Sequence, residues 1–240
     1  MNISKIVVTV LLLSLPQFSH ATVIDLTTAN SSGVLYGAIF KQINADNPGG
    51  SGVFDSFLRI QKDQVEHGYN TNGKLEFDTK AGAHTHALSL ADIPVVMIGS
   101  VAYREFCLDI NQNGQKTLSL DELKIHIASA ANLTEYPTNS NFGPAIYNLD
   151  QTGDNLVTMD YTLNPGSGKG DVVLLVPSVL FGTDTSKYVY LYSKLGVNLQ
   201  ADDGFEEWGI GEGGTPIIPE PATLAILSLG SVLMATRRKK

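Results

Sequence analysis

Short apolar segments, each ended by glycine, asparagine, aspartate or proline, are the feature that most restricts how this chain can fold. Phe54–Gln61 and Tyr103–Leu108 alternate between two kinds of side chain, as strands do when only one face is buried. The strand-like segments are Thr22–Leu26, Val34–Phe40, Phe54–Gln61, Val95–Gly99, Tyr103–Leu108, Val157–Leu163, Asp171–Val176 and Tyr188–Tyr192. We therefore predict a mostly β protein, in which residues 22–208 form a single antiparallel, jelly-roll-like β-sandwich with a short helix.

The short helix is predicted in a segment that combines helix and strand signals. Ser119, followed three residues later by Glu122, matches a capping box at a helix N-terminus. Leu123, Ile125 and Ile127 instead alternate as in a strand. We predict one helical turn followed by a strand.

The N-terminus has the pattern of a Sec signal peptide. Lys5 precedes the apolar run Ile6–Leu15, and residues 19–21 read Ser-His-Ala. The run is short for a membrane span, which takes about 20 residues. We expect the Sec translocon to export the chain and signal peptidase to cleave after Ala21, which assigns residues 1–21 to the signal peptide.

A second apolar segment lies at the C-terminus. Ala222–Thr236 contains 15 residues without a charge, and four cations follow it. As a helix this segment would extend about 22 Å, short of the bilayer core of about 30 Å. The positive-inside rule keeps the cations in the cytoplasm. We predict a transmembrane helix at 222–236 that holds the body outside the membrane, with Gly209–Ile218 as a Gly- and Pro-rich tether.

The order of these C-terminal features resembles the PEP-CTERM sorting signal of Gram-negative bacteria. Its residues here are Pro219, Glu220 and Pro221, then the apolar stretch, then a basic end with Arg237 and Arg238. The resemblance covers residues 219–240. It implies that exosortase, a transpeptidase-like cysteine protease of the membrane, recognises the tail. It also implies delivery to the cell surface or extracellular matrix, often in species that make exopolysaccharide. The body is similar to uncharacterised PEP-CTERM proteins, for example over Asp203–Trp208, which implies no activity.

The part between the two signals is acidic. Residues 22–218 hold 11 Lys and Arg against 23 Asp and Glu, a net charge of −12. Nucleic acids require cationic surfaces, so we expect no nucleic-acid partner. An excess of carboxylates is compatible with divalent cations.

The strongest candidate for a cation site follows Leu108. Oxygen-bearing side chains stand on alternate residues at Asp109, Asn111 and Asn113, with Gly114 in the sixth position. This spacing resembles EF-hand and dockerin calcium loops. The closing acid is displaced, because position 12 is Leu120.

Calcium is the predicted cofactor of this loop. The predicted ligands are Asp109, Asn111, Asn113, Gln115, Asp121 and Glu122. The alternative is an Asx-rich turn whose side chains bond to their own backbone.

Three functions are compatible with these patterns. We favour an exported, non-catalytic surface or matrix protein, since the sequence contains no arrangement of nucleophile and base. The alternative is a carbohydrate-binding module for exopolysaccharide, with Tyr188, Tyr190 and Trp208 as aromatic contacts or Trp208 as a core residue. A secreted hydrolase that uses the acids between Asp202 and Glu207 is the least favoured, since paired carboxylates must lie at defined distances across a sugar.

Overall fold

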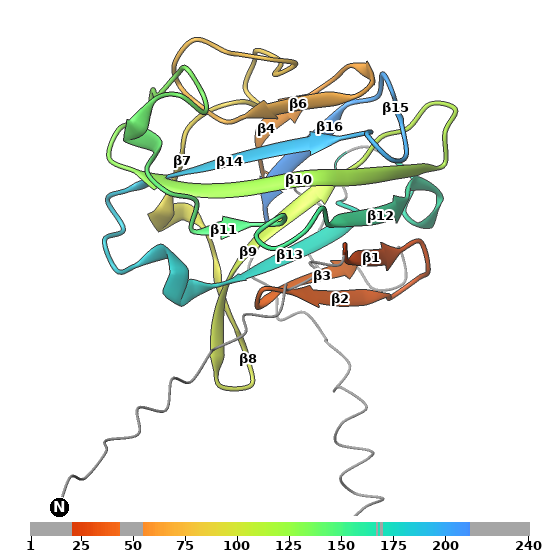
Figure 1. The fold of residues 1–240 in the computed structure, drawn as a ribbon, viewed down its shortest axis with the longest axis horizontal. Helices are drawn as coiled ribbons and strands as arrows, with labels where there is room; N and C mark the ends of the chain where they lie inside the picture. The colour runs from red at the N-terminus through yellow and green to blue at the C-terminus, as the bar shows by residue number, and fades with distance from the viewer. Residues whose placement is uncertain (1–20, 44–54, 167, 169, 212–240) are drawn as a thin grey trace, which may run out of the picture.

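The computed structural model describes residues 21–43, 55–166, 168 and 170–211, which contain two large β-sheets (Figure 1). The first sheet has the order β1-β12-β10-β14-β6, with β11 beside β10 and β7 beside β14. Its strands are β1 (Val23–Leu26), β6 (Glu66–Tyr69), β7 (Leu88–Ser89), β10 (Thr117–Ala128), β11 (Tyr147–Asn148), β12 (Leu156–Asp160) and β14 (Tyr188–Leu195).

The second sheet has the order β2-β3-β13-β9-β16-β4, with β8 beside β9. Its strands are β2 (Ser32–Leu35), β3 (Ala38–Gln42), β4 (Asp55–Ile60), β8 (Val95–Ile98), β9 (Val101–Asp109), β13 (Val172–Pro177) and β16 (Glu206–Ile210). A small third sheet pairs β5 (Asp63–Gln64) with β15 (Ala201–Asp202).

One hydrophobic cluster joins the two large sheets. It contains Leu120 and Leu191 from the first sheet and Phe106, Leu174 and Trp208 from the second, all at most 1% exposed. Such a shared core is typical of two stacked sheets. The mostly β class and the β-sandwich are thereby confirmed. One pairing departs from the antiparallel rule, because β1 and β12 run parallel.

The predicted helical turn at Ser119 is wrong. Residues Thr117–Ala128 form one continuous strand, β10, with a bulge between Leu120 and Glu122. A bulge adds one residue to a strand, so Leu120 and Leu123 both face the core although three positions separate them. The Ser119–Glu122 spacing that matched a capping box therefore lies within a bulged strand. The helical segments in the described part of the chain are 3-10 turns of three or four residues, namely η1 (Leu90–Asp92), η2 (Ser140–Phe142), η3 (Tyr161–Leu163) and η4 (Ser178–Phe181).

Two predicted segments are divided by turns. The segment Val34–Phe40 is a hairpin, in which β2 and β3 pair across a turn at Tyr36 and Gly37 with φ angles of 49° and 82°. Val157–Leu163 ends as a strand at Asp160 and continues as η3. In neither place does apolar content alone reveal the turn.

The predicted tether begins too early. Gly209 and Ile210 belong to β16 and pair with β9, opposite Cys107 and Phe106. The sandwich therefore includes both residues, and a second bulge in β16 lies between Trp208 and Gly209.

Candidate functional site

The predicted calcium loop is organised around a carboxylate from another part of the chain. The backbone N–H groups of Asn113 and Gln115 donate to the Asp202 carboxylate at 2.8 and 2.7 Å, and that of Gly114 donates to it as well. Burial opposes the charge of Asp202, but these three donors outweigh it and hold the pKa of Asp202 below its usual value. The loop thus directs its amide groups at an anion.

The remaining predicted ligands have other partners. Asp121 lies at the bulge of β10 and accepts hydrogen bonds from Ser119 Oγ, Val197 N and Asn198 Nδ2 at 2.7–2.8 Å. The Glu122 carboxylate forms ion pairs of 3.1 Å with Lys124 and Lys194. Neither carboxylate is directed at the 109–115 loop.

Asp109 is buried at the end of β9, where its Oδ2 accepts the N–H of Gly168 at 2.6 Å. Burial raises the pKa of Asp109 to about 6 and that of its neighbour Asp171 well above the usual value. Within the part of the chain that the structure describes, no group of three or more His, Cys, Asp or Glu side chains is arranged to hold a metal ion. Calcium binding by this loop stays a prediction.

The acids at the end of the body also point to separate partners. Glu206 is fully buried, contacts Glu66 and accepts a hydrogen bond of 2.7 Å from Gln112 Nε2. Glu207 pairs with Arg59. Asp202 holds the loop described above, so these carboxylates do not face one another across a shared cleft.

The aromatic residues predicted to contact a saccharide lie mainly inside the protein. Trp208 is 0% and Tyr190 is 1% exposed, whereas Tyr188 is half-buried. Successive residues of β14 point to opposite faces. Its tyrosines therefore leave the central core and pack in a second cluster, with Tyr136 and Phe142 from the segment after β10.

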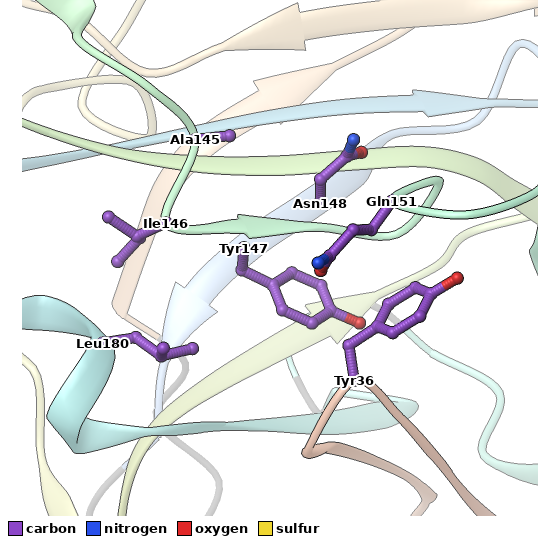
Figure 2. A pocket seen from close by; sticks show the side chains of 7 residues that line it. All are labelled: Tyr36, Ala145, Ile146, Tyr147, Asn148, Gln151 and Leu180. Atoms are coloured by element: carbon purple, nitrogen blue, oxygen red, sulfur yellow. The ribbon is translucent and has the colours of Figure 1, made fainter. Parts of the chain in front are cut away.

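A pocket of about 430 Å3 lies elsewhere on the sandwich (Figure 2). Tyr36 reaches it from the β2–β3 turn and Leu180 reaches it from η4. The other lining residues lie in β11 or next to it in the chain. The full lining is Tyr36, Ala145, Ile146, Tyr147, Asn148, Gln151 and Leu180. Figure 2 shows the two tyrosine rings on one side of the pocket with the amides of Asn148 and Gln151 above them.

Hydrogen bonds of the Tyr36 hydroxyl hold one wall of the pocket in place. This oxygen is 2.6 Å from Thr152 Oγ1 and accepts N–H donors from Thr152 N and Asn155 Nδ2, both at 3.1 Å. The backbone of Tyr36 is left-handed, with a φ of 49°. Sequence reasoning missed the pocket, and the single available signal was the Tyr36-Gly37 pair as a turn within an apolar run.

The chemistry of the lining is neutral. It combines aromatic and aliphatic surface with two amides and contains no Asp, Glu, Lys, Arg or His. Gln151 is exposed, and its amide bonds to none of the described residues. An amide offers both donors and acceptors, so this pocket suits an uncharged ligand with hydroxyl groups better than an ion.

The sorting-signal residues Pro219, Glu220, Pro221, Arg237 and Arg238 lie outside the described residues, as do residues 1–20 of the predicted signal peptide. The predicted transmembrane helix at 222–236 lies there too. Among the residues that are described, no helix is long and apolar enough to cross a membrane.

Comparison with known proteins identifies the C-terminal signal. The PEP-CTERM protein-sorting motif matches residues 218–239. No curated protein and no solved structure matches the chain, so the similarity of the body to other proteins of this kind stays a prediction. The motif implies export and processing by exosortase. The chain therefore carries the PEP-CTERM protein-sorting motif at its C-terminus.

Proposed function

We propose that this protein is a non-catalytic component of the cell surface or extracellular matrix of a Gram-negative bacterium. The sorting motif at residues 218–239 carries this proposal, since its implied partner exosortase acts on exported proteins at the membrane. The Sec translocon moves the chain outward, and the apolar segment Ala222–Thr236 pauses in the inner membrane with its four cations in the cytoplasm. Exosortase then acts on the tail.

The state of the acidic side chains supports a non-catalytic role. Glu206 and Glu66 are buried together, and Glu207 is paired with Arg59. The thiol of Cys107 is buried and unpaired, and burial raises its pKa well above the usual value, which opposes formation of the nucleophilic thiolate. These groups are buried or paired within the fold and are not available to a substrate.

Intact mass and fractionation in a host that encodes exosortase test the proposal. We expect a mature chain that starts at Thr22, with its C-terminal tail processed and the protein in the surface or matrix fraction. In a strain without exosortase the tail should remain and the protein should stay in the inner membrane. A P219A/P221A variant should behave in the same way in the parent strain. Full-length protein in the cytosol, with Met1 and Lys240 in place, would contradict the proposal.

The neutral pocket supports a second candidate function, binding of an uncharged saccharide such as a segment of exopolysaccharide. Sugar hydroxyls require amide-type donors and acceptors beside apolar or aromatic surface, which Asn148, Gln151 and Tyr36 supply. Retention on purified matrix polysaccharide tests this function, with Gln151→Ala expected to weaken retention. Gln115→Ala is the matched control, because Gln115 is also exposed and lies outside the pocket. Equal retention of both variants, or none by the parent protein, would exclude the pocket as a saccharide site.

A further inference from the structure

The β8–β9 hairpin projects from the sandwich (Figure 1). Its two strands pair through Met97 and Ala102 and close with Ile98 opposite Val101. The two-residue turn between them begins at Gly99, whose φ of 58° is readily adopted by glycine. The hairpin is thus an ordered extension of the second sheet.

This hairpin is uncharged and apolar on an otherwise acidic protein. Residues 93–103 read Ile-Pro-Val-Val-Met-Ile-Gly-Ser-Val-Ala-Tyr. Val95, Met97 and Val101 are 50%, 52% and 45% exposed. Exposed apolar side chains gathered at one protruding tip are typical of a surface that meets a partner or a membrane.

The chain leaves the sandwich in the direction of this hairpin. Strands β9 and β16 are antiparallel, with Glu207 opposite Asp109 and Ile210 opposite Phe106. Each step along β16 therefore moves towards the start of β9, where the hairpin lies. Gly211 follows the same direction and lies beside Glu105, the residue that precedes Phe106 in β9. A Cβ atom placed on Gly211 would overlap the side chain of Glu105.

The chain beyond Gly211 is long enough to extend past the tip of the hairpin. From Phe106 to Gly99 a strand advances about 23 Å at about 3.3 Å per residue. From Gly211 to Pro221 the chain can extend about 33 Å at most. The start of the apolar segment can therefore reach the level of the hairpin tip, with about 10 Å to spare when the chain is fully extended.

We propose that the tip of the β8–β9 hairpin, Met97–Val101, contacts the outer surface of the lipid bilayer while the C-terminal segment holds the protein there. The inference rests on the membrane-held state in the proposed function. The acidic body is repelled by anionic headgroups, whereas an uncharged apolar tip can enter the interface. The hairpin thereby orients the body and keeps the tether accessible beside the membrane.

Fluorescence of labelled full-length mature protein, residues 22–240, in phosphatidylcholine–phosphatidylglycerol vesicles tests this proposal. An environment-sensitive probe is placed on Met97→Cys in a Cys107→Ala background. Val197→Cys is the matched control, since Val197 is 51% exposed and follows β14 near Asp121, remote from the hairpin. We expect probe emission at position 97 to rise and shift to the blue, with several-fold stronger quenching by doxyl-labelled lipid than at position 197.

The possible outcomes separate this inference from the proposed function. Protein that floats with vesicles but gives equal quenching at positions 97 and 197 would overturn the hairpin contact and leave the membrane anchor intact. Protein that does not float would overturn both. A blue shift at position 97 without vesicles would show that a second copy or the chain's own tail covers the hairpin, which also overturns the proposal. A second probe, on Ser100→Cys, should lose its lipid quenching when Val101→Asp is added, while flotation persists.

Discussion

The indole nitrogen of Trp208 lies 3.0 Å from the hydroxyl oxygen of Ser193, and its N–H donates a hydrogen bond to that oxygen. Trp208 belongs to β16 in the second sheet and Ser193 to β14 in the first, so the bond crosses the core of the sandwich. Both residues are 0% exposed. The bond satisfies a polar group that the large indole would otherwise carry into the core without a partner.

Replacing Ser193 with alanine is expected to lower the free energy of unfolding by about 1–3 kcal/mol, because a buried donor loses its acceptor. Urea denaturation measures the effect. Ser32→Ala is the control, since Ser32 is exposed on β2. Equal unfolding midpoints for the two variants would show that the bond contributes nothing to stability.

Asp202→Ala should reduce stability by about 1–2 kcal/mol, because it removes the anion that accepts three backbone N–H groups at a partly solvated site. Asp55→Ala, at an exposed position, is the control. The lowered pKa of Asp202 means that its contribution is present above about pH 4 and is lost as pH falls. The difference between the two variants in thermal unfolding should therefore shrink in acid.

Calcium binding is tested on the same protein by thermal unfolding in EDTA and in millimolar CaCl2. A cation held by residues 109–122 would raise the melting temperature by mass action, and Asp109→Asn would abolish that rise. Identical melting temperatures in both solutions would leave the loop as an Asx-rich turn closed by Asp202.

Gly204→Ala is expected to destabilise the protein by about 3 kcal/mol or more, since its Cβ would overlap the carbonyl oxygen of Asn111. Gly114→Ala, in the same loop pair, is the control. A Cβ there has Asp202 Oδ2 at 3.7 Å as its nearest neighbour. Similar urea midpoints for both variants would show that the 109–115 loop adapts freely.

The contribution of two buried glutamates to stability should fall as pH rises from about 4.5 to 7 and should level off above that range. Burial raises the pKa of Glu66 and of Glu105 to about 7, so the folded protein binds more protons than the unfolded chain, where glutamate titrates near 4.3. The stability that these groups contribute is complete below about pH 4 and is lost through pH 7. Each proton released accounts for a slope of about 1.4 kcal/mol per pH unit at most.

The buried histidines change stability in the opposite direction over part of this pH range. Burial lowers the pKa of His67 and His126, so their contribution is lost as pH falls below about 6.5. Glu66→Gln should flatten the decline of urea stability between about pH 4.5 and 7, because an amide can donate to Glu206 without titrating. Glu135→Gln, at an exposed site, should leave the slope unchanged. A Glu66→Gln variant whose stability changes with pH as steeply as that of the parent protein between about pH 4.5 and 7 would contradict the prediction.

Patterns local in sequence gave reliable predictions. Alternation and turn residues predicted β1, β4, β8, β9 and β13 close to their observed bounds, and the mostly β class with them. The ordered signature at residues 219–240 predicted the sorting motif, which depends on a linear order of residue types and not on folding. These features need only neighbours along the chain.

Tertiary structure decided what the polar side chains do. Asp109 and Asn113 have the spacing of calcium ligands. The backbone N–H groups of this loop instead donate to Asp202, which lies 89 residues after Asn113. Ser119 and Glu122 have the spacing of a capping box, but pairing with β14 and β12 places both in strand β10. The Tyr36 hydroxyl contacts Thr152 because the chain turns between β2 and β3. A hydrogen bond or a pocket requires convergence of distant segments, and their register is set by the packing of two sheets around Trp208. The spacing of residues along the chain therefore does not predict which distant segments meet.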